Sequence, residues 1–312
     1  MAERNSLTID VGGASVLFNE NIGSAQALEL LTIEQADTRV VFGQADDEVD
    51  DTGGVGPVNL VSADAGIDIG TGTDVIGRDS TGGLLANGGI FLNGGTSGLI
   101  ELHTIDSQVR FNGVLTLQSD VRIDTDTDDA DDGTGGSVTF TNDTPIDSGD
   151  GTDDVPSTQT AERNSLSIDV GGASVLFNED IGALQPLGSL TIEQADTRVV
   201  FGQADNEVDD TGGVGPVNFI SADTGIDVGA AGHVIGRDSN GVLLDGGGIF
   251  VNGGATNLIE LNTLDGSVRL NGVLSLQTDL RIDTDTDDAD DGTGGQVSFT
   301  NDTPIDSDDG TD

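Results

Sequence analysis

The sequence predicts an all-β protein, a parallel β-solenoid built from two tandem repeats of about 159 residues. Three observations support this prediction: a long internal repeat, short apolar alternations, and the regular spacing of those alternations. Residues 2–152 return at 161–311 with a constant offset and no insertion, and the stretch 32–46 (TIEQADTRVVFGQAD) returns unchanged at 191–205. A long internal period is typical of arrays of stacked structural units.

The repeat also predicts the domain organisation. Residues 2–152 form repeat 1, 153–160 form a linker or a long external loop, and 161–312 form repeat 2. The linker has no apolar periodicity, and we favour a continuous solenoid axis through it because the repeat has no obvious caps. We expect the sequence to come from a longer array, with any signal peptide outside it. No apolar run reaches the roughly 18 residues of a membrane span, so membrane insertion is not expected.

The expected strands are short and alternate apolar with polar residues, flanked by Gly, Asn or Asp. In repeat 1 they cover 6–11, 15–18, 31–33, 39–42, 58–61, 66–69, 89–92, 108–111, 114–117, 120–123 and 137–140. The best helical candidate is 24–31. Its counterpart in repeat 2 contains Pro186 and Gly188, which argue against a helix.

The spacing of these strands favours a solenoid. Apolar strand residues pair nine positions apart, as at Leu7 and Val16 or Leu31 and Val40, and the pairs recur at intervals of 24 and 27 residues. This predicts coils with two strand-bearing faces and a return loop, and roughly six to eight coils per repeat. Two tandem β-sandwiches are the alternative, supported by Asn-Gly pairs at 87–88, 93–94 and 112–113 that suit hairpins.

The charge of the chain excludes some partners and favours others. Acidic residues number 57 against 10 basic ones, for a net charge of −47. Such a chain repels phosphate backbones and attracts cations, so nucleic acid is not an expected partner. Cysteine, tryptophan and tyrosine are absent. Disulfides and thiolate metal sites are therefore excluded, and the rings that most carbohydrate platforms use are missing.

The acidic motif at 124–133 (DTDTDDADDG), which returns at 283–292, predicts a calcium site. Its alternating carboxylates followed by a glycine can wrap a hard cation that takes six to eight oxygen ligands. The candidate ligands are Asp124, Asp126, Asp128, Asp129, Asp131 and Asp132, with Asp283, Asp285, Asp287, Asp288, Asp290 and Asp291 in repeat 2. A solvated acidic loop is the alternative, since Gly135 stands where an EF-hand has its last carboxylate.

A second acidic cluster at 46–51 returns at 205–210. Its candidate ligands are Asp46, Asp50, Asp205 and Asp209, because carboxylates this dense need counter-ions or wide solvation. We expect the arginines, by contrast, to form ion pairs with neighbouring aspartates rather than to bind acidic sugars.

No catalytic arrangement is evident, so the chain is not expected to be an enzyme. His103 aligns with Asn262, and His233 aligns with Asp74, so neither histidine is repeated. No Ser-His-Asp pattern is present, and the paired carboxylates lack an aromatic residue to hold a sugar ring.

Two phrases of the sequence resemble a known family. They are 181–192 (IGALQPLGSLTI) followed by 197–201, and 112–124 (NGVLTLQSDVRID) leading to 136–140. Both resemble the repeats of very large bacterial surface exoproteins, the filamentous-haemagglutinin-like and autotransporter-type adhesins. The resemblance covers most of each repeat. It implies a right-handed β-helix, export to the cell surface, and a role in adhesion, matrix or fibre building.

We therefore expect a structural segment of a secreted bacterial surface or extracellular-matrix fibre or adhesin, stabilised by calcium. The expected partners are neighbouring repeats or other copies of the chain, which would assemble into filaments, and a surface glycan. The alternative function is a module that binds a glycan, ice or a mineral surface.

Overall fold

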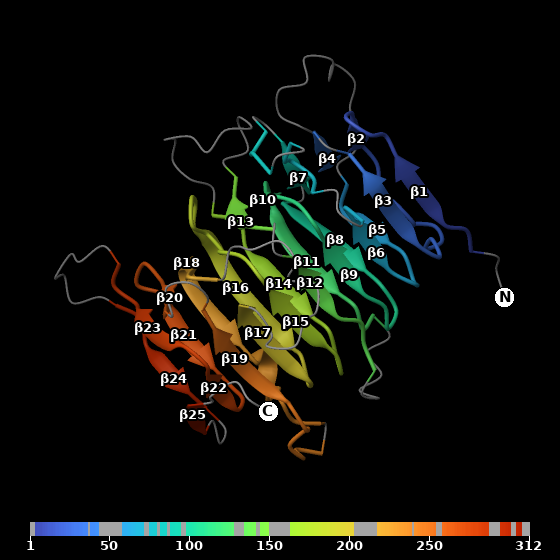
Figure 1. Cartoon of the computed structure of the whole chain (residues 1–312). Coiled ribbons are helices and arrows are strands. Elements are labelled where there is room, and N and C mark those ends of the chain that lie inside the picture. Colours follow the sequence, from blue (N-terminus) through green and yellow to red (C-terminus); the bar gives the residue numbers. More distant parts are fainter. Residues whose placement is uncertain are drawn as a thin grey trace.

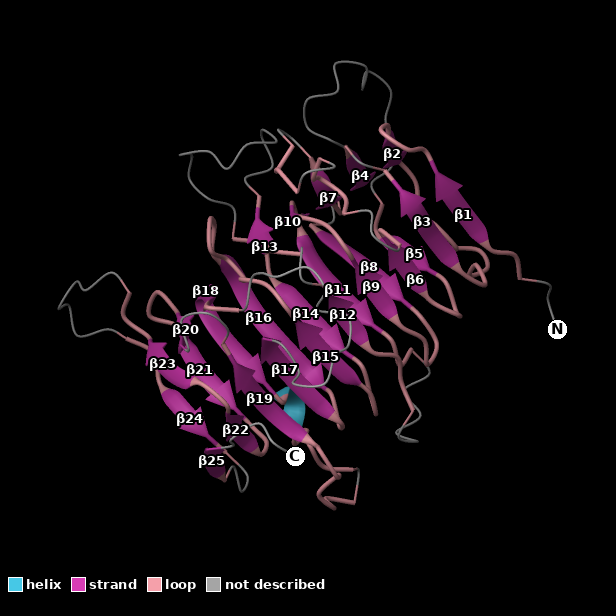
Figure 2. Cartoon of the chain, viewed as in Figure 1, coloured by secondary structure: helices cyan, strands magenta, loops and turns pink. Residues whose placement is uncertain are grey.

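The computed structural model (Figures 1 and 2) describes residues 4–36, 38–43, 58–71, 75–79, 82–85, 88–94, 98–127, 134–141, 144–149, 163–202, 217–238, 240–253, 258–286, 294–300 and 304–307. Within them the chain consists of short strands, and the one helical element is the 3-10 turn η2 (Ala230–Gly232). The all-β prediction is confirmed. Residues 24–30 contain only bends and an isolated bridge, and Leu31 begins a strand, so this stretch is not a helix, as the proline and glycine of repeat 2 indicated.

The strands form three parallel sheets, which the chain visits in the order A, B, C (Figure 1). Sheet A contains β1 (Leu7–Asp10), β3 (Leu31–Gln35), β6 (Ile67–Ile69), β9 (Val109–Phe111), β12 (Val138–Phe140), β15 (Ser174–Phe177), β17 (Arg198–Gly202), β19 (Gly248–Asn252), β22 (Leu274–Leu276) and β25 (Ile305–Ser307). Sheet B contains β2 (Ser15–Phe18), β4 (Arg39–Phe42), β7 (Gly89–Leu92), β10 (Leu115–Leu117) and β13 (Ile146–Ser148).

Sheet C contains β5 (Leu60–Ser62), β8 (Leu99–His103), β11 (Asp120–Asp124), β14 (Leu166–Asp169) and β16 (Leu187–Gln194), followed by β21 (Ser267–Leu270) and β24 (Val297–Phe299). The long strand β18 (Phe219–Val228) joins two sheets. Its first residues pair with β20 (Leu258–Asn262), which continues to β23 (Asp279–Asp283) on sheet B, and its last residues pair with β21 on sheet C. Isolated bridges of Ile181 to Ile146 and Ile220 connect the two parts of sheet B.

The pairings between these strands are parallel, and each strand inside the stack is bonded to the strand one coil earlier and the strand one coil later. The parallel β-solenoid prediction is confirmed, and the β-sandwich alternative is wrong because the predicted sandwich is built from antiparallel sheets. Stacked coils let every strand residue meet its equivalent on the next coil, so inward Val, Ile, Leu and Phe form ladders along the axis.

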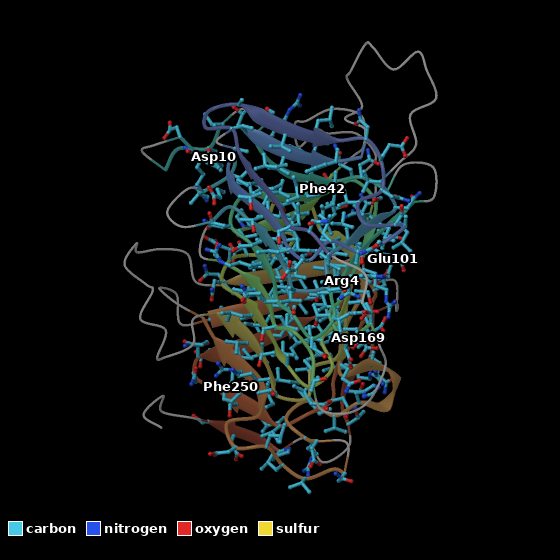
Figure 3. The ribbon with its side chains drawn as sticks, turned by 90° about the vertical axis from the view of Figure 1, so that its right-hand side faces the viewer. Arg4, Asp10, Phe42, Glu101, Asp169 and Phe250 are labelled. Atoms are coloured by element: carbon cyan, nitrogen blue, oxygen red, sulfur yellow. The ribbon has the colours of Figure 1, made fainter. Side chains whose placement is uncertain are left out.

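One continuous core fills the interior of the coils in both repeats (Figure 3). Its largest members are phenylalanines that repeat at the same strand position. On sheet A, the rings of Phe111, Phe140, Phe177 and Phe201 stack with centroids 5.0–5.5 Å apart. The stack passes from repeat 1 into repeat 2 between Phe140 and Phe177 without a break, so the repeats form a single hydrophobic unit.

The two repeats do not occupy equivalent sheets. β1 begins repeat 1 on sheet A, whereas its counterpart β14 begins repeat 2 on sheet C. One repeat therefore takes fourteen steps from sheet to sheet, which at three steps per turn makes four and two-thirds turns. With about 4.8 Å between coils, one repeat advances the axis by about 22 Å.

The predicted coil geometry is therefore wrong in two respects. First, each coil has three strand-bearing faces rather than two and a return loop, because the return path is itself a strand, such as β8 or β11. Second, each coil is therefore longer, and one repeat makes four and two-thirds coils rather than roughly six to eight. The strand at 146–148 was also missed, because Ile146 is its only large apolar residue. The linker prediction lies largely outside the described residues; its flanks are β13 on sheet B and β14 on sheet C, an ordinary step between consecutive sheets.

Candidate functional site

The first aspartate of the acidic motif ends strand β11 and is buried. Asp124 Oδ1 accepts a hydrogen bond from the backbone N–H of Asp126 at 3.1 Å, and its Oδ2 lies 3.2 Å from Nη1 of Arg122. Both carboxylate oxygens therefore have protein partners. Asp124 closes the strand with a local aspartate turn, which redirects the chain toward the next sheet.

Asp126 lies where the two repeats meet. It is buried, and a Cβ placed on Gly171 of repeat 2 would collide with its Oδ2, so only glycine fits opposite this carboxylate. In repeat 2 the same turn is formed by Asp283, whose Oδ1 accepts from the N–H of Asp285 at 3.2 Å. This second turn is more exposed because β23 lies in the last described coil.

The structure does not bring the two acidic motifs together, because Asp124 ends a strand of sheet C and Asp283 ends a strand of sheet B. The remaining predicted ligands lie outside the described residues: Asp128, Asp129, Asp131, Asp132, Asp287, Asp288, Asp290, Asp291, Asp46, Asp50, Asp205 and Asp209. In the part of the chain that is described, no three His, Asp or Glu side chains form a group that could hold a metal ion.

Arginines on the outer faces of the sheets pair with carboxylates, as expected. Arg122 contacts carboxylates on two following strands, with its Nη2 3.9 Å from Asp169 Oδ2 and 3.7 Å from Glu193 Oε2. Burial raises the pKa of Asp169, and the carboxylates of Asp124 and Glu193 raise it further. Other pairs are Arg110 with Asp68, Arg163 with Asp223, and Arg269 with Asp227.

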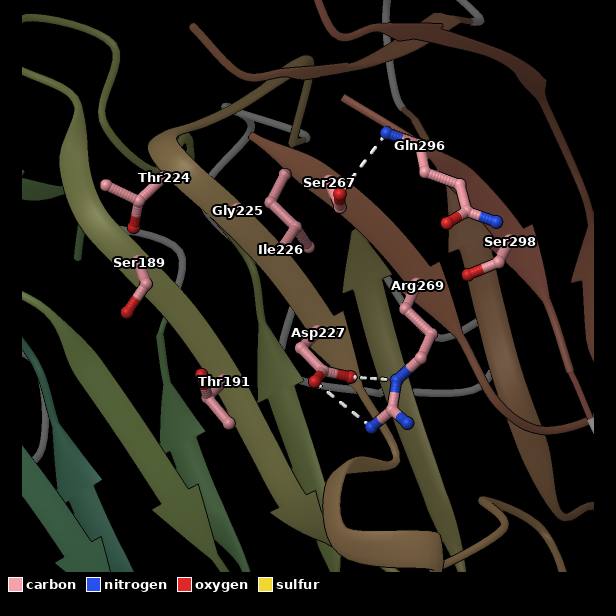
Figure 4. A pocket seen from close by; sticks show the side chains of 10 residues that line it. All are labelled: Ser189, Thr191, Thr224, Gly225, Ile226, Asp227, Ser267, Arg269, Gln296 and Ser298. Atoms are coloured by element: carbon pink, nitrogen blue, oxygen red, sulfur yellow. Dashed lines mark hydrogen bonds and ion pairs between the residues drawn. The ribbon is translucent and has the colours of Figure 1, made fainter. Parts of the chain in front are cut away.

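A hollow of about 510 Å³ lies on the outer face of sheet C in repeat 2, over β16, β18, β21 and β24 (Figure 4). Hydroxyl and amide side chains line it: Ser189, Thr191, Thr224, Ser267, Gln296 and Ser298. Arg269 and Asp227 form one wall as a two-point ion pair, with Nε to Oδ1 at 2.7 Å and Nη2 to Oδ2 at 3.0 Å. The hollow therefore combines many neutral donors and acceptors with one fixed charge pair.

The equivalent surface of repeat 1 lies on sheet A and keeps the charge pair, since Arg110 Nη1 lies 3.1 Å from Asp68 Oδ1. Two of its other positions are bulkier, however. Leu30 stands in place of Ser189 and Gln108 in place of Ser267, and both side chains lie within 4 Å of where a Cβ on Gly66 would be. The two substitutions replace a leucine and a glutamine by serines, which opens the surface in repeat 2.

The sequence analysis did not predict this hollow, because its lining residues come from four separate strands and form no local motif. The signal that could have found it lies among the positions at which the repeats differ. Between repeat 1 and repeat 2, Leu30 becomes Ser189, Ala65 becomes Thr224 and Gln108 becomes Ser267. These changes lie far apart in sequence, and only the stacking of coils shows that they share one face.

Comparison of the chain with protein-family models, with curated proteins and with solved structures finds no match. No helix among the described residues has the length and apolar character needed to cross a membrane.

Proposed function

We propose that the chain is a structural segment of a secreted bacterial surface or extracellular-matrix fibre or adhesin. The observation that carries the proposal is the continuous core, in which repeat 1 ends on sheet B at Ile146 and repeat 2 begins on sheet C at Leu166 with no break in the hydrophobic ladder. A solenoid of this kind grows along one axis as repeats are added, so its length is set by repeat number. The resemblance of 112–124 and 181–192 to adhesin repeats supports the same role.

The chemistry of the surface supports a role outside the cell without catalysis. The chain has no cysteine, and the excess of acidic over basic residues gives it a strong negative charge that keeps its outer surface solvated. A spacer of this type needs length and resistance to unfolding. Stacking of coils supplies the length, and the backbone hydrogen bonds between coils resist unfolding.

Calcium binding is part of the proposal. The net charge of −47 works against a compact state, and divalent ions at the acidic segments would relieve this repulsion. The aspartate turns at Asp124 and Asp283 start the two acidic segments with a defined geometry. We expect millimolar calcium to raise the melting temperature, EDTA to reverse the change, and sodium chloride at equal ionic strength to have a smaller effect. A melting temperature that chelation leaves unchanged would remove calcium from the proposal.

The location of the protein tests the main proposal. Antibodies raised against the folded chain should label intact, unpermeabilised cells of the source organism or their surrounding matrix. Small-angle X-ray scattering should give an axial length of about 45 Å for the two repeats. Labelling that appears only after permeabilisation would overturn the surface role.

A second candidate function, binding of a neutral glycan, is favoured by the hydroxyl-lined hollow on sheet C. Neutral sugars present many hydroxyls that Ser, Thr and Gln side chains can bind, and the Arg269–Asp227 pair offers a donor and an acceptor held in place. A glycan array is the test. Binding should disappear in the double variant Ser189→Leu, Ser267→Gln, which gives repeat 2 the residues of repeat 1, and should persist in the matched variant Leu30→Ser, Gln108→Ser. An array without any bound glycan would exclude this function.

A further inference from the structure

The last described coil exposes apolar side chains whose counterparts in repeat 1 are buried in the core. Phe299 is 41% exposed and Ile305 is 49% exposed, and Val297 beside them is also exposed. Their counterparts in repeat 1 are Phe140, Ile146 and Val138, which are at most 1% exposed. The residue types are the same, so the difference comes from what covers them.

The contact between the repeats shows how this surface is covered when a partner is present. There β11 pairs with β14, β12 pairs with β15, and Ile146 bridges to Ile181. Val138 lies against Val175, and the rings of Phe140 and Phe177 stack with centroids 5.0 Å apart and planes 6° apart. This contact, which we call the internal joint, is a complete template for the end of repeat 2.

The other half of the template stands unpaired at the opposite end of the molecule (Figure 1). The residues of repeat 2 that enter the internal joint are Leu166, Ile168, Val175, Phe177 and Ile181, and repeat 1 carries the same types at Leu7, Ile9, Val16, Phe18 and Ile22. Leu7 is 36% exposed where Leu166 is fully buried. On the side of the last coil, the apolar pattern is kept with one change, Val121 to Leu280.

We propose that the last coil binds the first coil of a second copy of this chain, head to tail, in the register of the internal joint. β23 pairs with the second copy's β1, β24 pairs with its β2, and Ile305 of β25 meets its Ile22. This inference deepens the proposed structural role by naming the partner and the register. Because both surfaces belong to the same chain, the contact repeats without closing and builds a linear assembly.

The polar groups around the two ends match in the same register. At the internal joint, Asp120 Oδ1 accepts from the N–H of Ser165 at 2.8 Å, and Arg122 faces Asp169 and Glu193. The end of repeat 2 carries the equivalent Asp279 and Arg281, and the start of repeat 1 carries Ser6, Asp10 and Glu34. The proposed contact therefore places one arginine against two carboxylates and leaves the edge strands paired rather than open.

Two glycines are matched to this contact. Gly171 has φ +52°, and a Cβ there would lie 2.6 Å from Thr134 O and also collide with Asp126 of the neighbouring coil. Gly12, its counterpart at the free end, has φ +57° with nothing within 4 Å. The space above Gly12 is open in the single molecule, whereas in the proposed assembly Asp285, the counterpart of Asp126, faces it. A methyl group at Gly12 therefore acts on association in addition to the backbone strain that it adds to the fold.

Sedimentation velocity across a range of protein concentrations tests the proposal, in about 0.5 M sodium chloride to screen the repulsion between acidic chains. The unaltered chain should form dimers and longer species as concentration rises. Gly12→Ala should weaken association by about tenfold or more, because the added methyl group overlaps the partner. Gly241→Ala, at φ +77° in an open turn, is the control and should associate like the unaltered chain. A chain that stays monomeric throughout the range would overturn the proposal.

Cysteine cross-linking tests the register, since the chain has no cysteine of its own. Thr139 pairs with Leu176 at the internal joint, so their counterparts Ser298 and Leu17 should be neighbours across the assembly. The variant Ser298→Cys, Leu17→Cys should form disulfide-linked ladders under oxidising conditions, because paired strands bring Cα atoms within disulfide range. The variant Ser298→Cys, Thr8→Cys places the second thiol on β1 and should not cross-link. Equal cross-linking in both variants would overturn the register.

These results are separate from the test of the proposed function. If the chain labels the cell surface but stays monomeric and uncross-linked, the structural role stands and the head-to-tail contact is wrong. If the chain assembles in register but is found only inside cells, the contact stands and the surface role is wrong.

Discussion

The end of repeat 1 and the end of repeat 2 have nearly the same sequence and opposite environments. Phe140 is fully buried in a stack of four rings, whereas Phe299 is 41% exposed at the edge of the last coil. Asp147 is buried next to backbone N–H groups of the following coil, whereas Asp306 is exposed. In a solenoid, the burial of a residue depends on whether another coil follows, because each coil contacts only its neighbours.

The largest effect that distinguishes the two ends should come from the phenylalanines. Phe140→Ala removes a ring from the middle of a stack and leaves a cavity, so we expect it to lower the free energy of unfolding by about 3–5 kcal/mol. Phe299→Ala removes a ring that is partly in water and should cost less than about 2 kcal/mol. Urea unfolding at low protein concentration measures both. Equal losses would contradict the internal joint as a buried contact.

A smaller difference is expected between two equivalent glycines. Gly171→Ala combines a left-handed backbone with a collision at the internal joint and should cost about 2–4 kcal/mol. Gly12→Ala has the same backbone geometry but open space around it, so its cost should be about 1–2 kcal/mol. Thermal unfolding of the two variants, followed by circular dichroism, makes this comparison. A loss for Gly12→Ala as large as that for Gly171→Ala would mean that backbone strain alone decides the outcome.

The smallest effect should be a change in pH dependence. Burial raises the pKa of Asp147, an effect opposed by hydrogen bonds from the N–H groups of Gln185 and Leu184 and increased by the nearby carboxylate of Asp180. The folded state therefore favours the protonated carboxyl. The stability that the protonated Asp147 carboxyl contributes is complete below the ordinary aspartate pKa of about 3.9. This contribution is lost as the pH rises through the raised pKa of Asp147 in the folded state.

Asp147→Asn cannot ionise and keeps an oxygen that accepts the two backbone hydrogen bonds. It should raise stability at pH 7 and flatten the fall in stability between acidic and neutral pH. Asp306→Asn, at the exposed end, should leave the profile of the monomer unchanged. Unfolding free energies measured from pH 4 to pH 7 provide the comparison, and identical profiles for Asp147→Asn and the unaltered chain would contradict it.

Much of the fold could be predicted from local sequence. Stretches such as 31–33, 39–42 and 89–92 alternate or concentrate β-branched, leucine and aromatic residues, and all three lie in strands. The third sheet was harder to predict. The strand at 120–124 follows the strand at 115–117 after only two residues, so the sequence pattern suggests that both lie on the same face of the coil. Corner geometry, rather than apolar spacing, separates these two strands.

The candidate sites were predictable to different degrees. The acidic motif is evident from the sequence of 124–133. The aspartate turn that begins it could also be expected, because aspartate side chains commonly accept a hydrogen bond from the backbone N–H two residues later. The hollow on sheet C was not predictable, because its residues come from four strands that only coil stacking brings together. No local pattern marks Ser189, Thr224 and Ser267 as neighbours.

The sequence by itself determined the repeat, the strand-forming segments and the chemistry of the inward ladder, since these depend on local backbone preference and apolar alternation. Only the tertiary structure decided that each repeat turns through four and two-thirds coils, so that identical residues face different sheets in the two repeats. It also decided which apolar ladders are covered and which remain open. The physical reason is that pairing between coils joins residues far apart in the chain, and their alignment depends on the lengths of all the corners between them.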